Sequence, residues 1–154
     1  MIRITLGRMF FDRAEVIRRI DKGTRRVLSR FGAFVRRTAR QSIRKRKRAS
    51  KPGQPPSSHT GLLKQFIFFG YDARQRSVVI GPEKLKGPVS EKAPSALEYG
   101  GESLTWDKKF GPIGGHVRST KTHRKIKVAA RPFMRPAFAK EKPGLPGLWR
   151  DSII

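Results

Sequence analysis

The sequence has no cysteine, which excludes disulfide bridges, thiolate nucleophiles and cysteine-ligated metal sites. No stretch approaches the ~20 consecutive apolar residues of a membrane-spanning helix. The first residues, MIRITLGRMFFDR, have neither a continuous apolar run of signal-peptide length nor a small-residue cleavage site. We therefore expect a protein that does not cross a membrane by that route and has no membrane partner.

Acidic residues are scarce. The 154 residues include 11 Asp and Glu against 36 Lys and Arg, which gives a formal net charge of +25. Such a charge attracts polyanions and makes copies of the chain repel one another. Apolar residues make up only 36% of the chain, below the ~45–50% of an ordinary globular domain. We expect a single domain over residues 1–154, with one modest core and solvated or partner-covered segments attached.

A long amphipathic helix is the strongest periodic signal. Asp12 stands at its N-cap position, and Glu15 three residues later completes a capping-box pattern. Gly23 and Gly32 interrupt the helix, either as bends or where another part of the chain approaches closely. We predict a basic helix over residues 12–46, with an apolar stripe formed by Val16, Ile17, Ile20, Val27, Leu28, Phe31, Phe34, Val35, Ala39 and Ile43.

The opposite face of this helix carries cations. Each like-charged pair at helical spacing opposes the helix by ~0.2–0.5 kcal/mol, so an anionic partner explains this density better than a solvated face does. The densest basic segment, residues 36–51, has nine cations and no acidic residue. Contacts with a partner or with nucleic acid are predicted for Arg36, Arg37, Arg40, Arg44, Lys45, Arg46, Lys47, Arg48 and Lys51.

The whole pattern predicts an α+β fold, in which the long N-terminal helix packs on a small, mainly antiparallel β-sheet. A short strand is expected within residues 1–8, and a Pro-rich extended loop over 47–61. The sheet region, 62–130, should contain a central hairpin, 62–71 with 77–81. Its other predicted parts are a helical turn with a glycine stop at 96–101, a strand at 103–106, a Gly-rich basic loop at 108–122 and a strand at 123–130.

Residues 131–154 should form a short C-terminal helix and a tail. Pro132 or Pro136 suits the first turn of that helix. Pro143 and Pro146 are expected to break it, which leaves residues 148–154 as an apolar-ended tail.

No set of residues points to catalysis. The three histidines, His59, His116 and His123, lack metal-ligand spacing, and the carboxylates are scattered. The glycines of residues 111–115 are not followed by the Lys-Ser/Thr of a phosphate loop. We therefore expect a protein that is not an enzyme, with no catalytic, cofactor-binding or metal-binding residues. Phe66, Phe68 and Phe69 could stack on bases, but their apolar surroundings favour a place in the core.

Three stretches together resemble the neck proteins of long-tailed bacteriophages, the head–tail joining or tail-completion family. The first is PPSSHTGLLKQFI (55–67), followed by VVIGP (78–82); the others are PSALEYGG (94–101) and ARPFMRPAF (130–138). Their order after a long N-terminal helix carries the resemblance, which covers most of residues 12–140. The family's last helix usually continues past its Pro-Ala, whereas PGLPG (143–147) follows here.

The resemblance implies a non-enzymatic virion subunit, assembled in the bacterial cytoplasm, that forms a homo-oligomeric ring around the DNA channel. Its partners would be the head-closure or adaptor proteins and the tail terminator, and it could also contact genomic DNA. Residues of the Pro-rich loop and the tail would reach neighbouring subunits, with Pro52, Pro55, Pro56, His59, Leu148, Trp149 and Ile153 as candidates. The alternative from the charge alone is a cytoplasmic nucleic-acid-binding protein of the ribosome-associated or nucleoid type.

Overall fold

The computed structural model describes residues 12–83, 93–113, 116–150 and 152, and between 106 and 122 it describes the backbone alone. The α+β fold is confirmed. The elements in chain order are α1 (Arg13–Ser42), β1 (Arg44–Lys45), β2 (Ser57–Ser58), α2 (Leu62–Gln65), β3 (Ile67–Asp72), β4 (Ser77–Pro82), α3 (Ala93–Tyr99), β5 (Gly101–Ile113), β6 (His116–Val128), α4 (Met134–Glu141), the 3-10 turn η1 (Lys142–Gly144) and α5 (Leu145–Arg150). The strand predicted within residues 1–8 lies outside the described residues.

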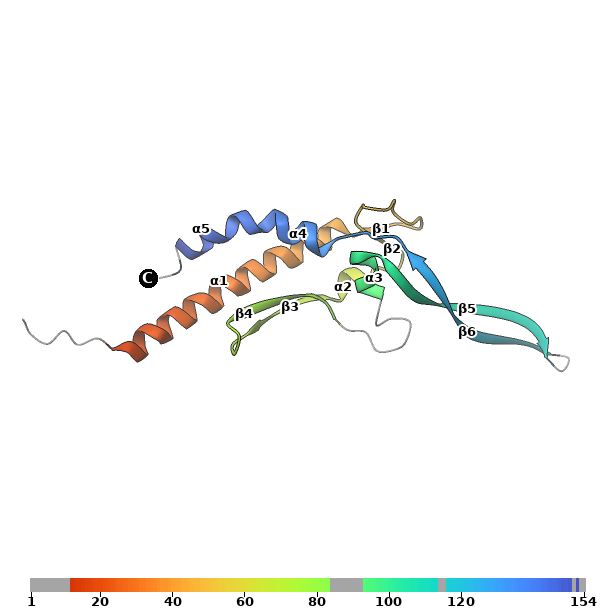
Figure 1. Cartoon of the computed structure of the whole chain (residues 1–154), viewed down its shortest axis with the longest axis horizontal. Helices are drawn as coiled ribbons and strands as arrows, with labels where there is room; N and C mark the ends of the chain where they lie inside the picture. The colour runs from red at the N-terminus through yellow and green to blue at the C-terminus, as the bar shows by residue number, and fades with distance from the viewer. Residues whose placement is uncertain (1–11, 84–92, 114–115, 151, 153–154) are drawn as a thin grey trace, which may run out of the picture.

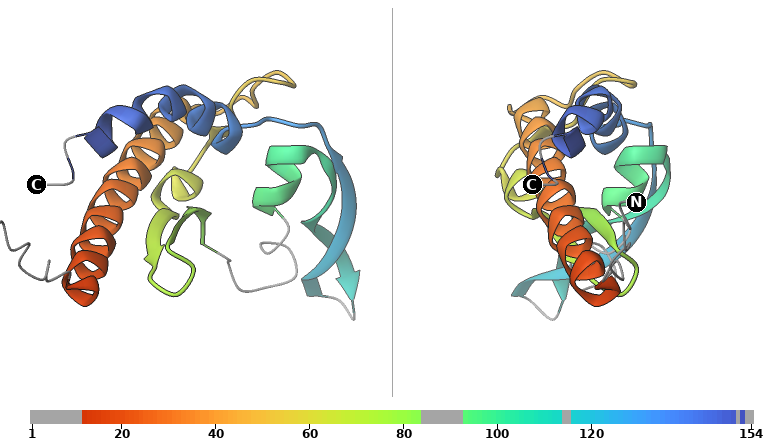
Figure 2. Two further views of the ribbon diagram at one scale, coloured as in Figure 1. Left: turned by 60° about the vertical axis from the view of Figure 1, so that its left-hand side comes forward. Right: turned by 90° about the vertical axis from the view of Figure 1, so that its left-hand side faces the viewer.

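Helix α1 is the central element of the fold. The β3–β4 hairpin packs on one side of it, and α4 and α5 pack on another (Figures 1 and 2). The core lies between these three layers and consists of Phe31, Val35, Ala39, Ile43, Ile67, Phe133 and Ala137. Phe31 also meets Phe138 of α4 edge to face, with ring centroids 5.6 Å apart. The predicted apolar stripe is therefore the surface on which both other layers are assembled.

The stripe is buried over only part of its length. Val27, Phe31, Val35, Ala39 and Ile43 are at most 3% exposed. Near the start of the helix, Val16, Ile17 and Ile20 are 37%, 40% and 46% exposed. The periodicity thus identified the correct face of the helix, but the other two layers pack mainly on its C-terminal two thirds.

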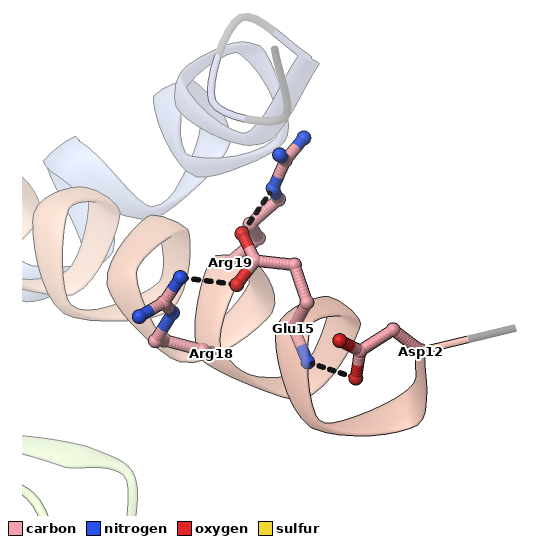
Figure 3. Close-up of polar contacts among 4 residues, drawn as sticks. All are labelled: Asp12, Glu15, Arg18 and Arg19. Atoms are coloured by element: carbon pink, nitrogen blue, oxygen red, sulfur yellow. Dashed lines mark hydrogen bonds and ion pairs between the residues drawn. The ribbon is translucent and has the colours of Figure 1, made fainter.

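The beginning of α1 matches the predicted N-cap (Figure 3). The Glu15 amide donates to the Asp12 carboxylate at 3.1 Å, as an N-cap requires. The Glu15 carboxylate accepts from Arg18 and from Arg19 Nε, the latter at 2.8 Å. The hydrogen bond to Arg19 is the main reason that the pKa of Glu15 lies below its usual value; desolvation opposes it, and the contact with Arg18 lowers the pKa further. Glu15 therefore neutralises part of the basic helix face instead of completing the predicted capping box.

Gly32 marks a close approach, not a bend, because α1 is one continuous helix. A Cβ atom on Gly32 would lie 2.8 Å from Val78 Cγ2 and 2.9 Å from Phe69 Cδ2. At Gly23 a Cβ atom would meet nothing nearer than the Ser152 carbonyl oxygen at 3.4 Å. The missing side chain of Gly32 thus lets the β3–β4 hairpin lie directly against the helix.

Replacing Gly32 by Ala should force the hairpin away from α1. We expect G32A to lower the free energy of unfolding by about 1–3 kcal/mol through overpacking. The matched variant G23A adds the same methyl group where space exists, and should leave stability unchanged or raise it by up to ~1 kcal/mol through helix propensity. Urea unfolding of both variants measures the difference, and equal effects would contradict the close approach.

The predicted hairpin is present, with two corrections. Its strands pair antiparallel from Ile67↔Pro82 to Asp72↔Ser77, but residues 62–65 form the helical turn α2, which follows Gly61 at φ +83°. Within the described residues, the hairpin is also a separate two-stranded sheet and not the centre of a larger one. Short apolar runs do not distinguish a strand from a buried helical turn, so the strand predicted from residue 62 starts too early.

The segment predicted as a Gly-rich basic loop, 108–122, is mostly strand. β5 and β6 pair antiparallel from Gly101↔Val128 to Ile113↔His116, and they take in the strands predicted at 103–106 and 123–130. The pair forms an arm that extends away from the body of the molecule (Figure 1). In the sequence, lysines and glycines break up the apolar positions Leu104, Trp106 and Phe110, so little of the alternation that reveals a strand remains, which explains the error.

The C-terminal α-helix starts at Met134 and ends at Glu141, shortly before Pro143, as the predicted break requires. Helical structure nevertheless resumes, because the 3-10 turn η1 follows α4 directly and α5 continues to Arg150. Pro143 lies in the first turn of η1 and Pro146 in the first turn of α5, where a missing backbone N–H is tolerated. Residues 148–150 are thus helical, and the tail predicted from residue 148 is wrong over these positions.

One buried carboxylate joins α3 to α4. Glu98 is 9% exposed and accepts three backbone N–H groups, from Phe133 at 2.9 Å, Met134 at 3.0 Å and Arg135 at 2.8 Å. These amides begin α4 and have no partner within the helix, and the carboxylate also suits the positive end of the helix dipole. The predicted glycine stop of α3 is confirmed, because Gly100 follows it at φ +78°.

Replacing Glu98 by Gln should destabilise the fold. The amide keeps the shape of the carboxylate but removes the charge and turns an NH2 group toward backbone donors, so we expect a loss of about 1.5–3 kcal/mol. E102Q removes an equal charge at an exposed position just after α3 and should change stability by less than ~0.5 kcal/mol. Chemical denaturation of both variants tests this, and similar losses would show that Glu98 is not the link.

Candidate polyanion-binding surface

Two adjoining hollows on the C-terminal half of α1 gather predicted contact residues. The arginine hollow, about 330 Å³, is lined by Ala33, Arg36, Arg37, Arg40, Gln41 and Lys64. The loop hollow, about 540 Å³, is lined by Gln41, Ser42, Arg44, Arg46, Ser50, Gln54, Pro55, Pro56 and Ser57. Gln41 lines both, so the two hollows are neighbours and together have six cations from three segments of the chain in their walls.

Arg36 is held in place by the fold. Its Nε donates to the Ile67 carbonyl oxygen at 2.8 Å, and its guanidinium lies over the Phe68 ring, 5.7 Å from the centroid. Phe68 is 47% exposed, so the core position expected for it is wrong, whereas Phe69 packs against Gly32 as expected. Arg36 is thus a positioned member of the arginine hollow that also fastens α1 to β3.

Arg37 is ordered by an aromatic ring. Its guanidinium lies 5.2 Å from the centroid of Phe34, and that of Arg30 lies 5.8 Å from the same ring. Contacts of this kind hold a cation in place without neutralising it. The aromatic rings of this surface therefore orient arginine side chains. The sequence did not predict this role.

The basic run after the helix is extended, not helical. Helix α1 ends at Ser42, since Ile43 has φ −79° and ψ 113°, and Arg44–Lys45 pairs in parallel with Ser57–Ser58. The predicted helix end at residue 46 is corrected accordingly. Arg44 and Arg46 line the loop hollow, while Lys45, Lys47, Arg48 and Lys51 are exposed beside it.

The Pro-rich loop, 47–61, is fastened to the body at two points. The Gly53 amide donates to the Ala130 carbonyl oxygen at 2.8 Å, and Arg131 Nε donates to the Ser50 carbonyl oxygen at 2.9 Å. Because these bonds fix the ends of the loop tip, the walls of the loop hollow are preformed. Only residues 57–58 depart from the predicted loop, as strand β2.

The predicted subunit-interface residues fall into two groups. Pro52 and His59 are exposed and Pro55 is half-buried, so the loop can present them to a neighbour. Pro56 is buried, and Leu148 packs against the core from α5, so both serve the subunit itself. Trp149 is half-buried in α5, and Ile153 lies outside the described residues.

Lys64 was missed by sequence reasoning. It lies on α2, next to three arginines of α1 in space, although 24 positions separate it from Arg40 in the sequence. The sequence predicts a strand from Leu62 onward, which does not bring Lys64 to the arginines. In the structure, Gly61 has a positive φ and the helical turn α2 follows it, which places Lys64 in the arginine hollow. The glycine before this segment was the local signal of that turn.

Among the described residues, no group of three or more His, Asp or Glu could hold a metal ion. In the same ranges no helix has both the length and the apolar content to cross a membrane. The chain matches no protein-family model, no curated protein and no solved structure.

Neutralising two cations of the arginine hollow should weaken polyanion binding selectively. We expect the double variant Arg40→Gln, Lys64→Gln to lose affinity for duplex DNA and to lower the slope of log K against log salt by about 1–2. Arg25→Gln with Arg74→Gln removes the same charge from exposed positions outside both hollows. Fluorescence anisotropy over a salt series measures both proteins, and identical slopes would contradict a defined binding surface.

Proposed function

We propose that the protein is a structural subunit of a phage neck, which forms a homo-oligomeric ring between the portal–adaptor complex and the tail. The observation that carries this proposal is the junction of two segments of the resemblance. Glu98, in the Leu-Glu-Tyr-Gly segment, caps the helix that begins in the Arg-Pro-Phe-Met-Arg segment. The Arg131 amide also donates to the Leu97 carbonyl oxygen at 2.6 Å. The two segments thus act as one structural unit.

The shape of the chain supports the same proposal. The core is confined to the contacts of α1 with one hairpin and the C-terminal helices, while an arm of two 13-residue strands extends from the body. A two-stranded hairpin is at most marginally stable by itself in water. A subunit whose arm is covered by its neighbours resolves this problem, as a ring would.

The net charge of the subunit supports a place in the particle where it contacts an anionic partner. With +25 on 154 residues, the subunit can assemble only if other molecules neutralise its basic surface. In a neck, acidic neighbouring subunits or the DNA of the channel would do so, with the arginine hollow and the loop hollow as the contact surface. A virion protein made in the host cytoplasm would meet both kinds of partner during assembly.

The second candidate function is a nucleic-acid-binding protein of the bacterial cytoplasm. The observation that favours it is the preformed pair of basic hollows, which needs no second subunit to exist. Phosphate groups are the natural ligands of clustered arginines. The two candidates differ in whether the chain assembles with itself.

Assembly state separates the two functions. We expect negative-stain images of the full chain, alone and with phage connector proteins, to show rings with a central opening, and light scattering to give one discrete oligomer. A chain that stays monomeric and binds RNA or duplex DNA tightly, with a steep salt slope, would overturn the neck assignment. As an independent check, the gene should lie beside those for portal, capsid and tail-tube proteins.

A further inference from the structure

Every strand in the described residues is an edge strand, because all three sheets have two strands. The β3–β4 hairpin packs on α1. Its two edges therefore have different surroundings. The bond from the Glu83 amide to the Phe66 carbonyl oxygen, 2.8 Å, continues the ladder and fixes which groups point inward. By the antiparallel alternation, the N–H and C=O groups of Val78 and Ile80 point to the outer edge of β4.

The outer edge of β3 is engaged at one position. The Ile67 carbonyl oxygen, which points outward by the same alternation, accepts from Arg36 Nε at 2.8 Å. Within the described residues, no backbone hydrogen bond reaches the outward groups of Val78 or Ile80. Pro82 ends β4 and has no N–H to donate, which is typical of an edge position. In the described part of the chain, the edge of β4 is therefore able to accept another strand.

A groove lies along this edge. Two hollows of about 340 and 310 Å³ share Ile80, Glu98, Tyr99 and Met134 and run between β4, α3 and α4. The walls are mostly apolar, and they include Val78, Phe133 and Phe138. Tyr99, which lines the groove, is 74% exposed. Val79, on the opposite face of β4 from Val78 and Ile80, is 66% exposed. An edge strand flanked by exposed apolar side chains is a site for strand addition.

The charge of the groove differs from that of the rest of the surface. Among the described residues, its lining includes one cation, Arg135, and two carboxylates, Glu83 and Glu98, in a chain of net charge +25. Two copies of such a chain repel each other wherever two basic surfaces meet. The groove is a place where a basic segment of a second copy can approach without meeting a cluster of cations.

The β5–β6 arm has the properties of that segment. Residues 101–128 hold seven Lys and Arg against two Glu and Asp, and the two strands span about 40 Å at ~3.3 Å per residue. The arm begins beside α3, which also lines the groove, but extends away from the β3–β4 hairpin of its own chain (Figure 1). Its outer edges are unpaired within the described residues.

We propose that the β5–β6 arm of one copy adds to the free edge of β4 of the next copy and covers the apolar groove. The contact uses different surfaces on the two copies, so it repeats head to tail and closes into a ring when the rotation per subunit permits. It shields two unpaired edges at once and places the basic arm against the cation-poor face. This inference rests on the proposed function, since it identifies the interface of that ring.

Cysteine cross-linking tests the contact directly, because the chain has no cysteine of its own. One chain carries Val79→Cys, and a second chain of different tag length carries Arg124→Cys or Lys125→Cys, which lie on opposite faces of β6. We expect a disulfide-linked heterodimer with at least one of the two arm variants under mild oxidation. The matched control places the first cysteine at Gln75 in the hairpin turn, and it should give a yield at least about tenfold lower.

A charge variant gives a second measurement. Val79→Lys puts a cation on the edge strand β4 itself, where the basic arm would pair, and we expect it to raise the concentration needed for assembly by about tenfold or more. Val16→Lys adds the same cation at an exposed valine of α1 and should have little effect. If rings form but neither disulfide cross-link appears, and the two lysine variants have equal effects, then this interface is overturned while the proposal of a ring stands. A chain that is monomeric at every concentration would overturn the proposed function itself.

Discussion

The three hydrogen bonds of the Glu98 carboxylate hold the fold together. They begin α4, and α4 and α5 form one of the two layers on α1, so the C-terminal layer depends on a residue 35 positions earlier in the sequence. The same carboxylate fixes α3, from which the β5–β6 arm starts. A core this small leaves little surplus stability. One buried charge that is fully hydrogen-bonded therefore sets the relative position of the helical layer and the arm.

The net charge constrains what this fold can do. Glu15 pairs with two arginines, and Asp21 pairs with Arg76 at 3.1 Å, but so few acids cannot neutralise 36 cations. The structure instead orders several cations by other means, with Arg36 bonded to a carbonyl and Arg37 beside an aromatic ring. Ordered but uncompensated cations are suited to an external anion, because little entropy remains to be lost when the anion binds.

The sequence predicted the features that depend on local pattern. The stripe through Val27, Phe31 and Val35 identified the buried face of α1, and Asp12 its first turn, because helical period and capping are local properties. Two short strands of the arm were predicted, but the pairing was not, because the paired residues lie up to 27 positions apart. The candidate surface was found only in part. Its arginines fall within one segment, 36–46, but Lys64 joins them through the tertiary fold.

The two proposed surfaces differ in charge, and each therefore suits a different partner. The arginine hollow and the loop hollow lie beside the C-terminal half of α1. The groove lies between β4, α3 and α4, and the described residues that line it include a single cation. If both surfaces carried the same density of cations, self-assembly would compete with anion binding for neutralisation. Because they differ, copies can join through the groove while the basic hollows stay open to DNA or an acidic neighbour. Assembly would then concentrate the remaining positive charge on a common surface, which strengthens attraction for a polyanion beyond what one subunit provides.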